Sequence, residues 1–99
     1  MKKLAIIIPA YKPRFLQETL DSIAKQNSHE FTVYIGDDAS PYPLKTIVDH
    51  YKNKFDIIYH RFEQNMGKKD LPGHWERCIL LSEEELIWLF SDDDLMPFD

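Results

Sequence analysis

Clustered carboxylates are the residues of this chain that are best suited to chemistry. Asp92, Asp93 and Asp94 stand side by side after an apolar segment, and Asp37 and Asp38 follow an earlier one. Adjacent carboxylates repel one another unless a cation neutralises them. A hard divalent ion, Mn²⁺ or Mg²⁺, takes such oxygen ligands together with waters and substrate phosphates. The alternatives are a solvated turn for the first cluster and an Asx turn for the second.

The elements that must position these clusters alternate along the chain. Short β-branched or apolar runs predict strands, and apolar residues at helical spacing predict helices. The expected strands lie near residues 4–8, 31–35, 57–59 and 86–90, and the expected helices near 13–26, 44–51 and 70–79. The order β-α-β-α-β-α-β predicts a Rossmann-like α/β fold with a parallel sheet and right-handed crossovers.

Prolines and one aspartate mark the expected helix starts. Pro13 suits the first position of the first helix, and Pro41 and Pro43 open the second. Asp70 is expected to cap the third helix, with Pro72 in its first turn. The pattern therefore places each helix start a few residues after a strand.

In a parallel α/β sheet, ligands bind at the carboxyl ends of the strands, where the strand order reverses. If the order is 3-2-1-4, strands 2 and 4 flank strand 1 and lie about 10 Å apart, which is roughly the span from a nucleoside base to its diphosphate. Asp38 would then accept a hydrogen bond from a base N–H or a ribose hydroxyl. Tyr11 would lie against the base, and residues 92–94 would hold a metal on the phosphates.

Five short motifs occur in one order along the chain. They are the strand into Pro9-Ala10-Tyr11, the strand into Asp37-Asp38-Ala39-Ser40, the turn Asn65-Met66-Gly67, the helix around Trp75-Glu76-Arg77-Cys78, and the strand into Ser91-Asp92-Asp93-Asp94. In this order and spacing they resemble the amino-terminal part of a family 2 glycosyltransferase with the GT-A fold. The chain departs from the family pattern at Lys12, where Asn is usual, and at Ser91, where many members have a first Asp.

The resemblance implies a glycosyltransferase that uses a nucleotide-diphosphosugar, UDP-linked in most members, with Mn²⁺ or Mg²⁺ and inversion at the anomeric carbon. The acceptor would be a saccharide or a lipid-linked molecule. The donor-binding residues that it implies are Pro9, Ala10, Tyr11, Asp37, Asp38, Asn65, Gly67, Arg77 and Asp92. The metal ligands fall among Asp92, Asp93 and Asp94, and which of the three binds the ion stays open.

The family's acceptor site and general base come after the last of these motifs, so the resemblance assigns no catalytic base here. Residues 1–99 are therefore expected to be the donor-binding half of a larger domain, truncated at the carboxyl end and inactive alone. Residues 86–90 would then form an apolar edge strand. Such an edge exposes unpaired backbone groups, and we expect the chain to self-associate through it.

Composition narrows the function class. The chain has 99 residues and a net charge of -5, which argues against a nucleic-acid partner because such binding needs a basic footprint. Its one cysteine, Cys78, excludes an internal disulfide and favours a reducing compartment. No apolar run approaches the roughly 20 residues of a membrane span. We expect a cytoplasmic protein, and a peripheral position at the inner face of the membrane stays open.

Other nucleotide- and metal-binding folds fit the pattern less well. A phospho-receiver domain needs an acidic pair after the first strand. Dinucleotide-binding and Walker-type folds need a glycine-rich turn there, whereas the glycines are Gly36, Gly67 and Gly73. A nucleotidyltransferase-like domain and a non-catalytic nucleotide-binding or interaction module remain as alternatives.

Several other residues have simpler expected roles. Trp75, Trp88 and Cys78 are expected in the core, and Lys68 and Lys69 on a solvated face. Arg77 is divided between that face and a contact with the diphosphate. The histidines lack metal-ligand spacing and are expected at the surface or in local hydrogen bonds; they are His29, His50, His60 and His74.

Overall fold

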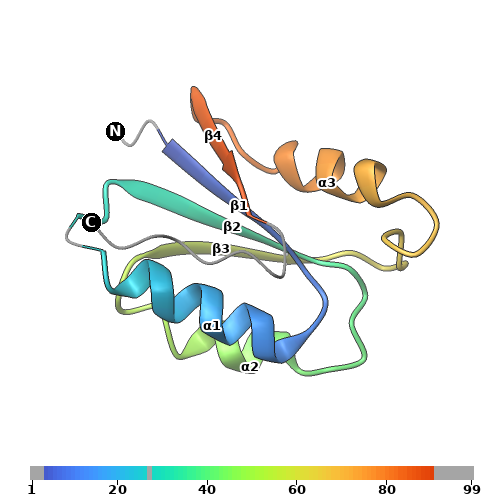
Figure 1. Cartoon of the computed structure of the whole chain (residues 1–99), viewed down its shortest axis with the longest axis horizontal. Helices are drawn as coiled ribbons and strands as arrows, with labels where there is room; N and C mark the ends of the chain where they lie inside the picture. Colours follow the sequence, from blue (N-terminus) through green and yellow to red (C-terminus); the bar gives the residue numbers. More distant parts are fainter. Residues whose placement is uncertain (1–3, 27, 91–99) are drawn as a thin grey trace.

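A four-stranded parallel sheet with helices on both faces forms the fold of this protein (Figure 1). The computed structural model describes residues 4–26 and 28–90. The elements are β1 (Leu4–Ala10), α1 (Pro13–Ala24), β2 (Phe31–Asp37), α2 (Leu44–Asp49), β3 (Asp56–Arg61), α3 (Leu71–Ile79) and β4 (Leu86–Leu89). The predicted α/β order of strands and helices is confirmed.

Strand order and register bring the ends of two central strands level with each other. The order is β3-β2-β1-β4, the one assumed in the sequence analysis, and β1 pairs with β2 from Leu4 opposite Phe31 to Ala10 opposite Asp37. Both strands run two residues further than the sequence pattern predicted. Beyond them, the backbone N–H of Asp38 donates to the carbonyl of Ala10 at 2.9 Å. The loops that follow β1 and β2 therefore start side by side.

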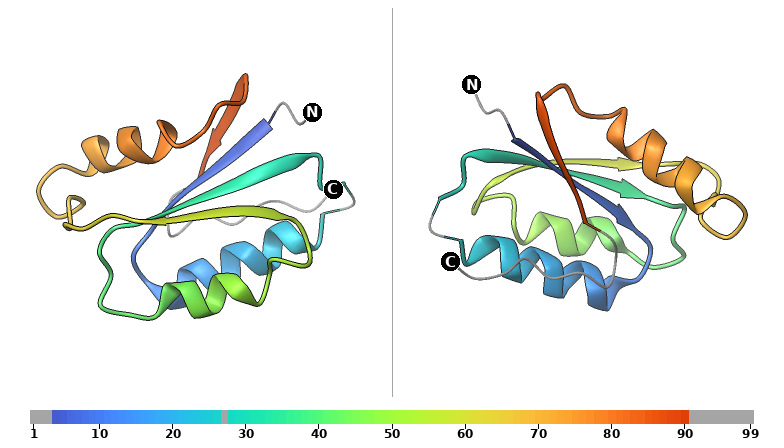
Figure 2. Two further views of the ribbon diagram at one scale, coloured as in Figure 1. Left: turned by 180° about the vertical axis from the view of Figure 1, so that it is seen from behind. Right: turned by 45° about the horizontal axis from the view of Figure 1, so that its top comes forward.

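The sheet has a core on each face because successive strand residues point in opposite directions. On one face, α1 and α2 cover Ile6 and Ile8, while on the other α3 covers Ala5 and Ile7 (Figure 2). Burial on both faces explains why β1 reads as a continuous apolar run. The predicted core position of Cys78 is confirmed, since this residue of α3 is fully buried against the sheet.

Helix starts agree with the prolines and the capping residue. Pro13 begins α1, and the side chain of Asp70 accepts from the backbone N–H of Gly73, as expected of an N-cap. The second helix begins at Leu44, with Pro43 as its N-cap, and it ends at Asp49, two residues earlier than predicted. Among the helices of residues 4–26 and 28–90, none has the length and apolar character needed to cross a membrane.

The prediction of a core position is wrong for both tryptophans. Trp75 is only partly buried and lies outside both core clusters, and Trp88 is 37% exposed. Trp88 lies on β4, which is at the edge of the sheet as expected, and its neighbours Leu86 and Ile87 are also exposed. Fewer neighbouring side chains cover the two faces of an edge strand than those of a central strand, so an apolar strand sequence alone overestimates burial here.

Helix α3 lies close to β2 because β2 has a glycine at the contact. A Cβ built on Gly36 would lie 2.3 Å from Sγ of Cys78 and 3.1 Å from Cε2 of Phe62. Neither a strand backbone nor a buried thiol can move away freely from such an overlap. The packing of α3 on the sheet therefore depends on the absence of a side chain at residue 36.

This contact predicts that Gly36→Ala will destabilise the fold by about 1–3 kcal/mol through overpacking. Urea unfolding followed by circular dichroism measures the change. In the double variant Gly36→Ala with Cys78→Ala, the clashing sulfur is absent. The loss of stability in the double variant should therefore fall well short of the sum of the losses in the two single variants. Strict additivity of the two substitutions would contradict the proposed contact.

Candidate functional site

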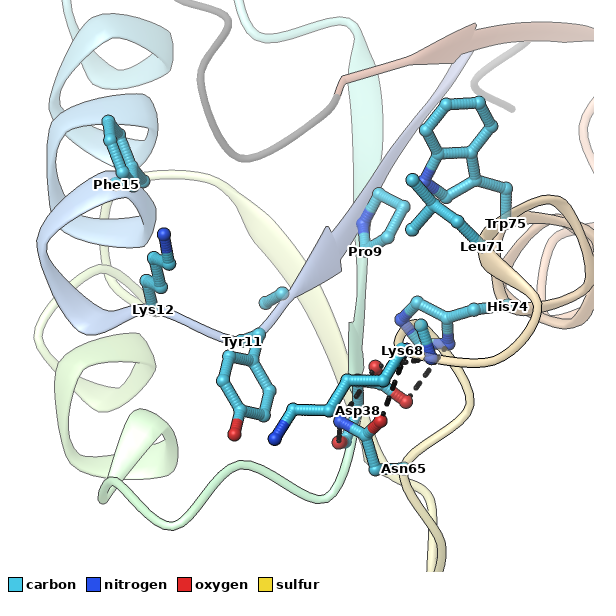
Figure 3. A pocket seen from close by; sticks show the side chains of 12 residues that line it. Pro9, Tyr11, Lys12, Phe15, Asp38, Asn65, Lys68, Leu71, His74 and Trp75 are labelled. Atoms are coloured by element: carbon cyan, nitrogen blue, oxygen red, sulfur yellow. Dashed lines mark hydrogen bonds and ion pairs between the residues drawn. The ribbon is translucent and has the colours of Figure 1, made fainter.

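A cavity of about 420 Å³ opens at the carboxyl end of β1, between the first turn of α1 and helix α3 (Figure 3). This is the edge at which β4 and β2 flank β1, so the cavity lies where the strand order reverses. The lining residues are Pro9, Ala10, Tyr11, Lys12, Phe15, Asp38, Asn65, Gly67, Lys68, Leu71, His74 and Trp75.

The structure brings most of the predicted donor-binding residues to this cavity. Those that line it are Pro9, Ala10, Tyr11, Asp38, Asn65 and Gly67. Asp37 and Arg77 do not line the cavity. Asp37 contacts Ser40 in the loop after β2, and Arg77 contacts Asp38 at the cavity floor. The predicted metal ligands, Asp92, Asp93 and Asp94, lie outside the described residues. Within residues 4–26 and 28–90, no group of His, Cys, Asp and Glu side chains could hold a metal ion.

Asp38 is almost fully buried at the floor of the cavity, and its carboxylate has four hydrogen-bond donors. Oδ1 accepts from the backbone N–H of Met66 at 2.7 Å and from the guanidinium of Arg77 at 2.8 Å. Oδ2 accepts from the backbone N–H of Gly67 at 2.9 Å and from the amide of Asn65 at 3.1 Å. A carboxylate has about four lone-pair sites, so this group is fully paired.

The 65–67 turn is therefore a carboxylate-binding loop. A Cβ on Gly67 would lie 2.6 Å from Oδ2 of Asp38, so a glycine allows the backbone N–H to approach the oxygen. A buried charge is tolerated only when it is paired and hydrogen-bonded. Arg77 supplies the opposite charge, and the loop supplies two N–H groups. The loop wall of the cavity is thus held in place by the buried side chain on its floor.

Arg77 is in turn held from three directions. Its Nε donates to Nδ1 of His74 at 2.9 Å, and its NH2 group donates to the carbonyl of Gln64 at 3.0 Å. Its guanidinium also stacks on the ring of Phe62, 3.9 Å from the ring centroid. His74 is buried, and this burial lowers its pKa below the ordinary value of 6.5. The imidazole is therefore neutral at pH 7.

Asp37 has a structural role at the end of β2. Its Oδ1 accepts from the backbone N–H of Ser40 at 2.9 Å, and its Oδ2 accepts from the hydroxyl of Tyr59 and, at 3.2 Å, from Arg61. Arg61 also donates to the carbonyl of Ser40 at 2.8 Å. Burial and the hydrogen bond to Asp37 raise the pKa of Tyr59 to about 12. Asp37 thus joins β2 to β3 and to the loop after β2.

The loop after β2 holds the backbone of Tyr11, one of the aromatic residues that line the cavity. Ala39 has a φ of 53°, a left-handed conformation that costs a non-glycine residue about 1–2 kcal/mol. The hydrogen bond from the backbone N–H of Ser40 to Asp37 offsets this cost. The hydroxyl of Ser40 then donates to the carbonyl of Tyr11 at 2.6 Å, which ties the loop after β1 to the loop after β2.

Part of the cavity wall escaped the sequence analysis. Leu71, His74 and Trp75 share one face of α3 at the spacing i, i+3, i+4, and Phe15 and Lys12 come from the start of α1. The helical spacing was visible, but it did not indicate which face of α3 meets the sheet. Lys68 is exposed, as predicted, and its side chain extends over the cavity in the direction of Tyr11 (Figure 3).

The buried ion pair predicts a large cost when its cation is removed. Arg77→Met should lower the free energy of unfolding by about 3 kcal/mol, because it leaves the Asp38 carboxylate buried with two neutral backbone donors and one amide. The matched control is Arg14→Met, which removes the exposed pair with Glu18, where the Arg14 side chain is 88% exposed. This variant should lose less than about 1 kcal/mol. Equal losses in urea unfolding would contradict the assigned burial.

The comparisons with known proteins agree on one family. The sequence profile of glycosyl transferase family 2 matches residues 5–99. Poly(ribitol-phosphate) beta-N-acetylglucosaminyltransferase TarS of Staphylococcus aureus is 34% identical over 97 residues, which cover 95% of this chain and 16% of TarS. The chain therefore spans about a sixth of the length of this relative.

Solved structures show the same likeness in three dimensions. The structure of residues 1–349 of S. aureus TarS in complex with UDP-GlcNAc has a TM-score of 0.80 and 31% identity, over 96% of this chain and 27% of that one. The mannosyltransferase PcManGT of Pyrobaculum calidifontis, in complex with GDP-Man and Mn²⁺, has a TM-score of 0.80 over 96% of this chain and 28% of that one. Its identity of 19% supports the fold alone.

Proposed function

The chain belongs to glycosyl transferase family 2, and on that premise we propose that its cavity is the donor site of a glycosyltransferase that uses a UDP-linked sugar. The observation that carries the proposal is the position of the cavity. It lies at the reversal of strand order and is lined by the residues that follow β1 and β2. The UDP-GlcNAc complex of TarS, at 31% identity, supports the choice of nucleotide.

The base would lie at the end of the cavity formed by Tyr11 and Asp38. Asp38 is already fully paired, so a base N–H needs one of its oxygens released. Asn65 can release Oδ2, because its amide also donates to the backbone carbonyl of Asp38 at 3.0 Å. The amide keeps that bond while the base N–H takes its place on the carboxylate. The ring of Tyr11 supplies a face for stacking.

The diphosphate and sugar would lie toward Lys12, Lys68 and the indole of Trp75, which line the rest of the cavity. The two ammonium groups offset phosphate charge, and the aromatic wall suits a sugar ring. Mn²⁺ or Mg²⁺ would be held by carboxylates among residues 92–94, whose oxygen donors fit a hard cation. The hydrogen bond from the N–H of Phe90 to the carbonyl of Ile7, at 2.8 Å, supports this proposal, because it keeps the chain beside β1 just before residues 92–94.

The proposed reaction is transfer to a hydroxyl of a saccharide or a lipid-linked acceptor with inversion at the anomeric carbon. The metal would stabilise the charge that develops on the leaving diphosphate. Inversion also needs a base that takes the proton of the attacking hydroxyl, and we assign no residue of this chain to that step. Residues 1–99 are thus proposed as the donor-binding part of the enzyme.

Base stacking predicts that Tyr11→Leu will weaken UDP binding by about 5- to 160-fold, since stacking on an aromatic ring contributes about 1–3 kcal/mol. Isothermal titration calorimetry with UDP and Mn²⁺ measures the change. Tyr42→Leu is the matched control, because Tyr42 is exposed and lies outside the cavity lining. No UDP binding by the wild type, or equal affinity of the wild type and Tyr11→Leu, would contradict the proposed donor site.

The proposed metal site predicts that Asp93→Asn or Asp94→Asn will abolish the tightening of UDP binding by Mn²⁺. Mn²⁺ alone should bind weakly to the wild type, because the diphosphate supplies part of its ligand set. Calorimetry with and without Mn²⁺ separates the two effects. Tight Mn²⁺ binding without nucleotide, unchanged in all three single variants at Asp92, Asp93 and Asp94, would point to another kind of metal site.

The exposed edge of β4 supports a further proposal, that two copies of this chain pair through Leu86–Leu89. Leu86 and Ile87 are 61% and 45% exposed on opposite faces of the strand. Two such edges can pair through their free backbone groups and bury these side chains together. Sedimentation velocity should detect a dimer that Ile87→Lys weakens. A monomer at high micromolar concentration would contradict the pairing.

A further inference from the structure

His74 lies between the cavity and the ion pair that shapes it. The histidine lines the cavity and is 2% exposed, and its Nδ1 accepts the bond from Nε of Arg77 at 2.9 Å. A guanidinium has donors only, so Nδ1 must carry a lone pair and no proton. The ring is therefore neutral, with its proton on Nε2. This assignment follows from the geometry of the bond.

The groups that face His74 come from β2, from the loop after it and from α3. Oδ1 of Asp38 lies 3.6 Å from Nδ1. Asp37, the residue before it at the end of β2, also acts on the ring through its charge. On its own helix are Arg77 and Cys78, whose Sγ lies 3.7 Å from Nε2. Burial and the Arg77 charge lower the pKa of His74, and the two aspartates raise it without cancelling the effect. The thiol takes no part, because burial raises its pKa to about 12.

Protonation of Nδ1 would change this arrangement in two ways. The proton would occupy the lone pair that Arg77 uses, so Nε of Arg77 would lose its acceptor and two cations would face each other. The new N–H would also lie within 3.6 Å of Oδ1 of Asp38, the oxygen that Arg77 binds. The imidazolium and the guanidinium would then compete for one carboxylate oxygen. The two backbone N–H groups of Met66 and Gly67 share that carboxylate.

We propose that His74 is a positioning residue for the nucleotide, and that it makes donor affinity sensitive to acid. The neutral ring fixes Arg77, and Arg77 fixes Asp38 and the 65–67 loop in the geometry that binds the base. Protonation of the ring releases Arg77 and loosens that loop. The proposal rests on the proposed donor site and adds its regulation by pH.

The direction of the pH effect follows from the protonation state that binds. The nucleotide selects the neutral form of His74, and the pKa of this group lies below 6.5 in the folded chain. Affinity is therefore constant near pH 7.5 and falls as the pH drops through the pKa of His74. Below that pKa, the loss approaches about tenfold per pH unit.

His74→Asn is the matched variant, because its amide oxygen takes the position of Nδ1, accepts from Arg77 and cannot be protonated. Calorimetry with UDP at pH 7.5 should give the variant near wild-type affinity. As the pH is then lowered in steps through the pKa of His74, the wild type should lose affinity that the variant keeps. The ligand and every residue other than residue 74 are the same in both proteins, so the difference isolates His74.

Two further variants complete the set. His74→Phe keeps a ring beside Phe62 but has no acceptor, so it should bind UDP several-fold more weakly at pH 7.5 and lack the His74 contribution at lower pH. His60→Asn changes an exposed histidine on the other side of Phe62 and should keep the wild-type profile. Matching pH profiles for the wild type and His74→Asn, or full affinity in His74→Phe, would overturn the proposal.

A measurement without ligand separates this proposal from the proposed donor site. Nitrogen-15 NMR should detect a coupling across the hydrogen bond from Arg77 to His74 at pH 7.5, and its loss in acid. The amide signals of Met66 and Gly67 should shift with the same midpoint. If they do and UDP does not bind, the donor site is wrong and the link from His74 to the loop holds. If UDP binds and these amides do not follow His74, the positioning role is wrong.

Discussion

The buried carboxylate of Asp38 is the constraint on which the site depends. A charge in this position needs a full set of donors. These are two backbone N–H groups and the Asn65 side chain of the 65–67 loop, together with Arg77 on α3. One side chain after β2 therefore sets the position of the loop before α3 and of the helix itself. Loops of this length without such a partner would have many conformations, because only local bonds would hold them.

Two neighbouring aspartates divide the structural work because successive residues point in opposite directions. Asp37 faces Tyr59 and Arg61 on β3, whereas Asp38 faces the 65–67 loop and α3. The first therefore fixes the loop after β2, including the left-handed Ala39, and the second fixes the opposite wall of the cavity. A single carboxylate could satisfy only one of these two sets of donors.

The sequence pattern was sufficient for the element order, because apolar runs and proline positions report local structure directly, whereas the strand order was only assumed. It was sufficient for the residues after β1 and β2, since their place follows from the sheet alone. It failed for Trp88, whose burial depends on what lies beyond an edge strand. It gave no sign of the contacts that Asp37 makes with Tyr59 and Arg61, or of the contact between His74 and Arg77. These roles depend on side-chain direction and on which face of α3 meets β2, and neither is a property of residue spacing.

Helix α3 joins the polar floor of the cavity to its apolar wall. Cys78 packs against Gly36 of β2 on one side of the helix, and Arg77 reaches Asp38. Leu71 and Trp75 of the same helix line the cavity. A rigid helix cannot shift at one of these contacts and stay fixed at the others. The side chain allowed at residue 36, although it lies outside the cavity lining, therefore affects the shape of the proposed donor site. Stability and ligand affinity should change together in this chain, because both depend on the fit of α3 against β2.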